Sequence, residues 1–282
     1  MKNLFILGST GYIGSRLSDF LRSNTDLSVF SAGRTNVDVH ADLQGEVDSL
    51  VNAAKAGDVV VFLSSISAPD VCANQPELVY QVNVTATLGL INQLTNKGVK
   101  VIFSSTDMVF GEYDAAATDN SQLKPFGYYG KMKADVEHEV INNDLVKVVR
   151  LSYVIGIGDK YTDMLSAMAA DEQQVEVFDG FERNAVAIDD VLQGIYNLTV
   201  EWDEFDVNSI NFGGPQLISR IDITQQFADN VCSNLNFKLV AAPEGFWHAR
   251  PKTIEMYSEV FSRLLGREPM SVEEKFQNWR NK

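Results

Sequence analysis

The sequence is poor in cysteine and histidine, and this scarcity excludes two classes of protein. Its two cysteines, Cys72 and Cys232, form no CxxC pair and are too few for a disulfide framework. The three histidines, His40, His138 and His248, lie too far apart for the ligand spacing of a zinc site. We therefore expect reduced thiols and no bound metal.

Basic residues and long apolar runs are also lacking. The chain has 23 lysines and arginines against 38 aspartates and glutamates, which gives a formal net charge of −15. Such an acidic surface repels phosphate backbones and anionic lipid, so nucleic acid and membrane are not expected partners. An anionic ligand must instead be held by local donors. Apolar runs fall short of a membrane span or a secretion signal, and a cytoplasmic location is expected.

Short runs of β-branched residues alternate with longer amphipathic stretches, which is typical of βαβ units and a parallel sheet. We predict strands at Leu4–Leu7, Leu27–Ala32, Val59–Leu63, Val99–Ser104, Val146–Leu151, the first part of Val186–Val200 and Ser209–Phe212. Helices are predicted from about Ile13, over Pro76–Asn96, Tyr129–Asn142, the second part of Val186–Val200, Ile221–Ser233 and Ile254–Leu265, with helix and loop between Gly156 and Arg183.

These elements predict an α/β fold, a doubly wound parallel Rossmann sheet with a smaller C-terminal α/β lobe that binds the substrate. The Rossmann domain would comprise residues 1–156, with residues 186–213 returning to it. The substrate-binding lobe would comprise residues 157–185 and 214–282.

Three glycines, Gly8, Gly11 and Gly14, follow the first predicted strand in the sequence GSTGYIG. In a dinucleotide-binding loop, glycine permits the tight first turn, the close approach of the pyrophosphate, and the close packing of helix on strand. The helix N-terminus then offers free N–H groups and a positive dipole end to the phosphates. Glycine triplets are common in turns, but this position between a strand and an amphipathic helix favours a dinucleotide site.

The end of the second predicted strand bears on the choice of cofactor. An NAD site usually has an acidic residue here, which accepts hydrogen bonds from the ribose 2′-hydroxyl. This chain has Arg34, whose planar guanidinium suits a 2′-phosphate. NADP(H) is therefore expected over NAD(H), although a solvated arginine on a turn would give the same pattern. Asp42 and Leu43 follow at a position that would border the adenine, where an aspartate is equally typical of a turn.

Tyr129 and Lys133 lie four residues apart on a predicted helix, which puts both side chains on one face. A phenol has a pKa of about 10, and a nearby ammonium and a cationic nicotinamide ring lower it. Tyr129 can then give a proton to a carbonyl oxygen while a hydride arrives, or run the reverse. Thr106 ends the fourth predicted strand, where open α/β sheets bind ligands, and its hydroxyl would orient the substrate oxygen.

Further motifs extend from one end of the chain to the other. They are GSTGYIG (8–14), Asp70-x-Cys72 with Pro76 and Asn83-Val84-Thr85, SSTDMVFG (104–111), Pro125 ahead of YGKMK (129–133), Arg150-x-Ser152-x-Val154-x-Gly156, Asp159-Lys160-Tyr161 with Met164-Leu165, Asp189-Asp190-Val191, and Arg250-Pro251. In their order and spacing they resemble the extended short-chain dehydrogenase/reductases that act on nucleotide sugars. The resemblance is greatest to the dTDP-4-dehydrorhamnose reductase branch.

This resemblance implies a catalytic triad of Thr106, Tyr129 and Lys133. The cofactor contacts that it and the motifs imply are Gly8, Gly11, Tyr12, Ile13, Gly14, Arg34, Asp42, Leu43, Leu63, Ser64, Ser65 and Asn83, with Tyr129 and Lys133. Asn83 has a second interpretation, in which its side chain ties down backbone. The expected substrate contacts are Ser67, Thr106, Asp107, Arg183 and Arg250. The two arginines would contact a diphosphate, or they would be ordinary surface residues. Relatives often form homodimers through the helices that carry Asn83 and Tyr129.

Departures from the family's patterns narrow the reaction. Sugar 4,6-dehydratases have Asp-Glu after the threonine, whereas this chain has Asp107-Met108, and a thioether is no base. The epimerase/reductases that make GDP-fucose use a cysteine that this chain lacks near Thr106. The stretch 181–186 differs from that of rhamnose-type reductases, so the sugar stays open. We expect reduction of a nucleotide-linked 4-keto-6-deoxy sugar, with a 4-epimerase and a non-catalytic NADP-binding regulatory subunit as alternatives.

Overall fold

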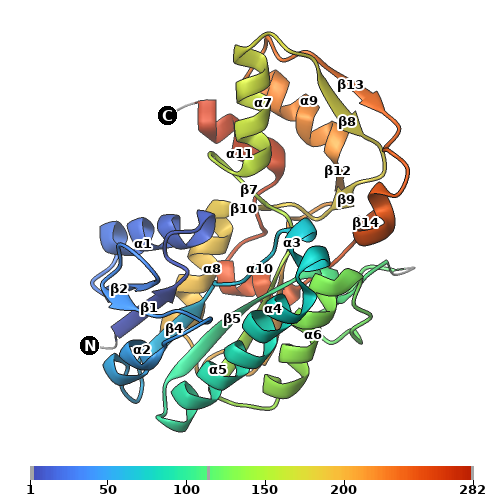
Figure 1. Ribbon diagram of the computed structural model, residues 1–282. Coiled ribbons are helices and arrows are strands. Elements are labelled where there is room, and N and C mark those ends of the chain that lie inside the picture. The colour runs from blue at the N-terminus through green and yellow to red at the C-terminus, as the bar shows by residue number, and fades with distance from the viewer. Residues whose placement is uncertain (1–2, 113–114, 281–282) are drawn as a thin grey trace.

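A seven-stranded sheet forms the centre of the structure, a computed structural model that describes residues 3–112 and 115–280 (Figure 1). The strands lie in the order β11–β6–β5–β4–β1–β2–β3, and all neighbours are parallel. The chain builds outward from β1 to β3 and then returns to place β4 on the other side of β1, a reversal that opens a ligand-binding crevice. The strands are β1 (Asn3–Leu7), β2 (Ser28–Gly33), β3 (Val39–His40), β4 (Val59–Phe62), β5 (Lys100–Thr106), β6 (Val146–Leu151) and β11 (Ser209–Phe212).

Helices cover both faces of this sheet. One face carries α1 (Tyr12–Asn24), α8 (Ile188–Val200) and α10 (Glu259–Leu265). The other carries α2 (Asp48–Ala53), α4 (Pro76–Tyr80), the π-helical segment Gln81–Ala86, α5 (Thr87–Asn96) and α6 (Gly127–Val140), with α3 (Pro69–Asn74) ahead of α4. All four residues of β4 are buried, as its wholly apolar sequence predicts. The predicted doubly wound parallel Rossmann sheet is confirmed.

A smaller part stands above the carboxyl ends of the strands (Figure 1). Its own apolar core joins three helices and a two-stranded parallel sheet, with residues such as Leu165, Phe227 and Phe276 fully buried. The elements are α7 (Lys160–Ala170), β8 (Val175–Phe178), α9 (Arg220–Asn230), β13 (Phe237–Val240) and α11 (Val272–Arg280). Short strands connect the two parts: β7 (Val154–Ile155) with β10 (Val186–Ala187), and β12 (Ile218–Ser219) with β9 (Glu182–Arg183) and β14 (Thr253–Ile254).

The structure corrects the sequence prediction in the C-terminal region. The helix expected over Ile254–Leu265 begins only at Glu259, where the Ser258 hydroxyl accepts a hydrogen bond from the Phe261 N–H. This helix, α10, packs on the larger sheet rather than in the smaller lobe, because Phe261 stacks on Phe212 of β11 with ring centroids 4.1 Å apart. The sequence prediction also missed α11 and most short strands of the smaller part, although β10 forms where a strand was expected at the start of Val186–Val200.

Two further features of the described residues concern membrane-spanning helices and metal-binding groups. Within the described ranges, no helix combines the length and the apolar character needed to cross a membrane. The same ranges hold no group of three or more His, Cys, Asp or Glu side chains placed to bind a metal ion. The expected cytoplasmic location stays a prediction.

Candidate active site

The glycine loop between β1 and α1 has the shape that a phosphate requires. Gly8 adopts φ 92°, which a side chain would disfavour, and its N–H donates to the Ala32 carbonyl at 3.0 Å. A Cβ on Gly14 would lie 2.2 Å from the Gly8 carbonyl oxygen, so α1 packs tightly against the loop. The first turn of α1 contains no acidic residue, which leaves the positive end of the helix dipole available to an anion.

Tyr12, the first residue of α1, has a hydroxyl suited to a ligand. Its Oη is buried and has no hydrogen-bond partner among the described residues. Burial raises the pKa of this phenol, and the charge of Asp159 adds to the rise. A buried polar atom without a partner is costly, so a polar group of a ligand would stabilise it. Ile13, like the Tyr12 ring, packs against the apolar core between the sheet and the helices on this face. The loop and the Tyr12 hydroxyl together fit a dinucleotide.

The other residues expected near the adenosine half differ in their surroundings. Arg34 is exposed just beyond β2. Asp42 accepts a hydrogen bond from the Gln44 N–H at 3.0 Å, which is the geometry of a turn residue. Leu43 is buried in the core between the sheet and its helices. Of these residues, Arg34 presents the side chain most accessible to a ligand.

The chain after β4 runs beside the glycine loop. A Cβ on Gly8 would lie 2.9 Å from the Ser64 backbone nitrogen and 3.1 Å from the Leu63 carbonyl carbon. Asn83 bonds to Ile66 in both directions, since its Oδ1 accepts from the backbone N–H at 2.9 Å and its Nδ2 donates to the carbonyl at 2.8 Å. Its amide therefore ties down this segment, as the second interpretation of Asn83 supposes.

Tyr129 and Lys133 lie on α6 next to this segment. The Tyr129 hydroxyl is 3.4 Å from Ser65 Oγ. Lys133 is buried, its Nζ donates to the Ser104 carbonyl at 2.6 Å, and that Nζ lies 5.8 Å from the centre of the Tyr129 ring. The helix thus brings both side chains to the carboxyl ends of β4 and β5.

The pKa values of this pair differ from the sequence expectation. Burial raises the pKa of Tyr129 to about 12, and the hydrogen bond from Ser65 opposes the rise. Burial also lowers the pKa of Lys133 to about 7, against the charge of Glu137. In the protein alone, therefore, desolvation outweighs the expected lowering of the phenol pKa by Lys133.

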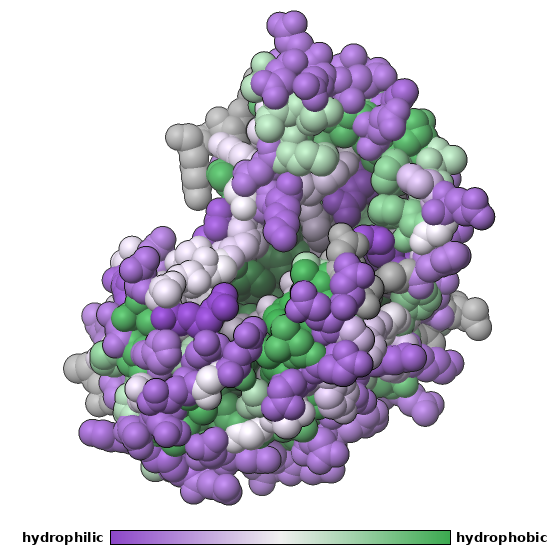
Figure 2. All heavy atoms as spheres, in the orientation of Figure 1, coloured by the Kyte–Doolittle hydropathy of each residue, from purple (hydrophilic) through white to green (hydrophobic). Residues whose placement is uncertain are grey.

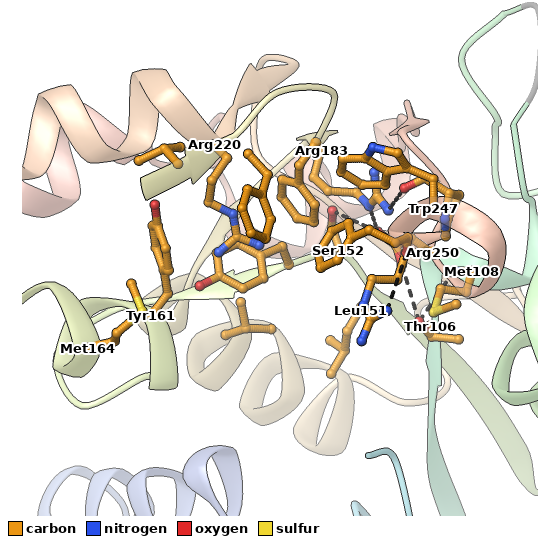
Figure 3. Close-up of a pocket in the computed structure, with 18 of the residues that line it drawn as sticks. Thr106, Met108, Leu151, Ser152, Tyr161, Met164, Arg183, Arg220, Trp247 and Arg250 are labelled. Carbon is orange, nitrogen blue, oxygen red and sulfur yellow. Dashed lines mark hydrogen bonds and ion pairs between the residues drawn. The ribbon is translucent and has the colours of Figure 1, made fainter. Parts of the chain in front are cut away.

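Thr106 ends β5 and lines a pocket between the sheet and the smaller part (Figure 3). Its Oγ1 donates to the Asp107 carboxylate at 3.2 Å and accepts from the Met108 N–H at 3.3 Å. Asp107 in turn forms an ion pair with Arg183 at 3.2 Å, and both side chains are buried. Burial raises the pKa of Asp107, and the guanidinium of Arg183 counteracts the rise.

The pocket has a volume of about 570 Å³ and is rich in aromatic rings. Figure 2 shows the molecule hollowed between its two parts, with hydrophobic residues inside the hollow. The size is in the range of small-molecule sites, and aromatic rings offer faces on which a nucleotide base can stack. The aromatic residues of the lining are Tyr153, Tyr161, Phe178, Phe181, Phe246 and Trp247.

Three arginines line this pocket, and they are not equivalent. Arg183 is paired with Asp107, and three of its other N–H groups donate to the carbonyls of Glu182, Pro251 and Lys252. Arg250 is half-buried and donates to the Phe246 carbonyl at 3.3 Å. The third is Arg220, at the start of α9, which the sequence analysis did not single out. Ser67 is exposed and is not part of the pocket lining.

Comparison with known proteins bears on this site. Residues 1–275 match the protein family described as the RmlD substrate binding domain. The chain is 25% identical over 178 residues to methionine adenosyltransferase 2 subunit beta of Xenopus laevis, a match that covers 61% of this chain and 53% of that protein. It is 26% identical over 177 residues to a dTDP-4-dehydrorhamnose reductase of Sinorhizobium fredii, which covers 62% of this chain and 58% of that protein.

The similarity in structure extends further than the similarity in sequence. A dTDP-4-dehydrorhamnose reductase from Clostridium acetobutylicum superposes with a TM-score of 0.82 at 18% identity, over 100% of both chains. The curated relatives, by contrast, are matched over little more than half of their length. The shared fold therefore includes both the sheet and the smaller part, between which the pocket lies.

Proposed function

The chain belongs to the family of the RmlD substrate binding domain, as its motifs predicted, and on this premise we propose that it reduces the keto group of a nucleotide-linked 4-keto-6-deoxy sugar with NAD(P)H. One observation carries the proposal. Tyr129, in the first turn of α6, lies next to Ser65 after β4, and Lys133 of the same helix bonds to Ser104 of β5. Thr106, at the carboxyl end of β5, lines the aromatic pocket. A hydride donor held on one side and a ketone on the other would meet there.

The residues of the chain divide the work of this reaction. The loop Gly8–Gly14 and the Tyr12 hydroxyl would hold the dinucleotide, which when bound supplies the hydride for the carbonyl carbon. Tyr129 donates its proton to the carbonyl oxygen, which becomes the product hydroxyl. A pKa of about 12 keeps Tyr129 protonated at neutral pH, as a general acid requires before reaction. Thr106 orients the ketone through its own hydroxyl.

Lys133 would assist Tyr129 as the general acid. The Ser104 carbonyl holds its Nζ 5.8 Å from the centre of the Tyr129 ring, and the charge that Lys133 carries when protonated would stabilise the phenolate that proton transfer leaves behind. Arg34 supports a preference for NADP(H), because it is exposed at the end of β2, where a guanidinium would meet a 2′-phosphate.

The test is oxidation of NADPH and of NADH by purified protein with a panel of dTDP-, UDP- and GDP-linked 4-keto-6-deoxy sugars. Stoichiometric oxidation with one sugar is expected, faster with NADPH. Tyr129→Phe should lower kcat by about 10²–10⁴-fold while NADPH still binds, because only the proton donor is removed. Absence of oxidation with every sugar, together with tightly bound NAD in the purified protein, would indicate the 4-epimerase instead.

A second candidate is a non-catalytic subunit that binds NADP, and the match to a subunit of methionine adenosyltransferase favours it. Against it stands the presence of Thr106, Tyr129 and Lys133 together, since a binding subunit does not need a proton donor. A purified protein that binds NADPH but leaves the whole sugar panel unchanged would support this candidate. We also propose a homodimer, which sedimentation of the purified protein would test.

A further inference from the structure

Charge in the aromatic pocket opposes the charge of the whole protein. The lining contains Arg183, Arg220 and Arg250 against the carboxylates of Asp107 and Glu176, although the chain carries a formal charge of −15. Asp107 neutralises Arg183, and Glu176 is paired with Lys238 at 3.0 Å. The uncompensated charge therefore lies on Arg220 and Arg250.

Arg220 is held between aromatic rings rather than by a carboxylate. Its guanidinium carbon lies 4.0 Å from the ring centre of Phe181, 4.2 Å from that of Tyr161 and 4.8 Å from that of Tyr153. Figure 3 shows the side chain hanging into the pocket from the start of α9. The ion pairs between described residues do not include Arg220.

The rings themselves are fixed by hydrogen bonds to other groups. The Tyr161 hydroxyl is 2.6 Å from Thr224 Oγ1, and the Tyr153 hydroxyl donates to Asp159 at 2.9 Å. The Asp159 carboxylate also caps α7, where it accepts from the N–H groups of Tyr161 and Thr162. The two tyrosine hydroxyls and the Asp159 carboxylate are therefore engaged with other groups and do not compete for the Arg220 guanidinium.

This arrangement suits the binding of a phosphate. Aromatic rings around a guanidinium attract it through cation–π contacts and hold it in place, and they leave its N–H donors available to an anion. A planar fork that is already oriented loses little entropy when it binds two anionic oxygens. Arg183, which the sequence had suggested for this role, already directs its N–H groups to Asp107 and to backbone carbonyls.

We propose that Arg220, clamped by Tyr153, Tyr161 and Phe181, binds the diphosphate of the nucleotide-linked substrate. The inference rests on the proposed function, because it names the residue that anchors the substrate of that same site.

The test is calorimetric titration of the protein with UDP, dTDP and GDP and with the corresponding nucleosides, in wild type, Arg220→Gln and Arg220→Lys. Arg263→Gln is a matched control, because Arg263 also lies over a ring, that of Phe205 at 5.7 Å, but outside the pocket lining. For the nucleoside diphosphate that binds best, Arg220→Gln should raise Kd about 10- to 100-fold, Arg220→Lys less, and Arg263→Gln not at all. Nucleoside affinity should be unchanged, and in turnover the loss should fall on KM rather than kcat.

Several outcomes would overturn the proposal. They are an unchanged diphosphate affinity in Arg220→Gln, an equal loss of nucleoside affinity, which would indicate a collapsed pocket, or a wild-type protein that binds none of the three diphosphates. If Arg220→Gln does not fold by circular dichroism, Arg220→Lys decides, because it keeps the charge but not the planar fork. Diphosphate binding needs no hydride transfer, so a protein that binds UDP through Arg220 but oxidises no NADPH would refute the reductase alone.

Discussion

Gly14→Ala tests whether the tight packing of α1 on the glycine loop forms the cofactor site. The new Cβ would lie 2.2 Å from the Gly8 carbonyl oxygen and 2.8 Å from the Ser9 Cα. These are backbone atoms, so no side-chain rotation relieves the contact. Because ordinary contacts begin at 3.4 Å, α1 must move from the loop by about 1 Å. Overpacking of this kind lowers the free energy of unfolding by about 1–3 kcal/mol.

The same movement should weaken cofactor binding. The N–H groups that would meet the pyrophosphate belong to the displaced loop and helix end, so the Kd for NADPH should rise by at least about 10-fold, which corresponds to about 1.4 kcal/mol. NADPH fluorescence titration and urea unfolding measure the two effects. Gly89→Ala is the control, because a Cβ there meets nothing within 4 Å and the residue is exposed on α5. It should leave the Kd unchanged and stabilise by about 0.5–1 kcal/mol. Equal NADPH affinities in the two variants would refute the reasoning.

Three further variants test other parts of the site. Asp107→Asn should lower the free energy of unfolding by about 3–5 kcal/mol, since it leaves the Arg183 charge buried without a partner, and adding Arg183→Met should restore most of it in urea. The folded-state pKa of Lys133, about 7, lies below its ordinary 10.5, so the folded protein binds fewer protons between these values and stability rises with pH there. Lys133→Met should flatten that rise in urea midpoints measured from pH 7 to 10, and an unchanged slope would contradict the assignment. Arg34→Ser should raise the Kd for NADPH about 10-fold and leave that for NADH unchanged, whereas equal effects would refute a 2′-phosphate contact.

The larger sheet was predictable because its strands carry strong local signals. Val59–Phe62 is apolar throughout and buried on both faces, and the glycine loop marks the transition from β1 to α1. Three short strands of the smaller part gave no such signal. β9, β12 and β14 have two residues each, too few for any periodicity, and they form only because distant segments pair with them.

The start of α10 was misplaced for a different reason. Ile254 and Met256 continue the apolar spacing of the helix toward the N-terminus, but the structure buries them in a separate cluster with Val109 and Phe110. A pattern of apolar residues records burial and does not record which core receives each side chain. Residues that belong to two different cores were therefore assigned to one face of a single helix.

The site likewise contains residues that the sequence predicts and residues that only the fold brings together. Tyr129 and Lys133 were identified because four residues of a helix place them together. Arg220 and its rings come from the β6–β7 connection, α7, the segment before β9 and α9, and nothing in their sequence spacing brings them together. The sequence also could not show that Arg183 is ion-paired, since its partner Asp107 is distant in sequence and becomes its neighbour only in the fold.

The partners of Asp107 and Glu176 also bear on the type of reaction. A water elimination needs a base to take a proton from carbon and an acid for the departing hydroxide, whereas a ketone reduction needs one proton donor beside the hydride. Among the described residues that line the pocket, the carboxylates are Asp107 and Glu176, and both are ion-paired. Met108, next to Thr106, lines the pocket with a thioether that cannot accept a proton from carbon. The described lining therefore offers no unpaired carboxylate to take a proton from carbon, which supports the proposed reduction over an elimination.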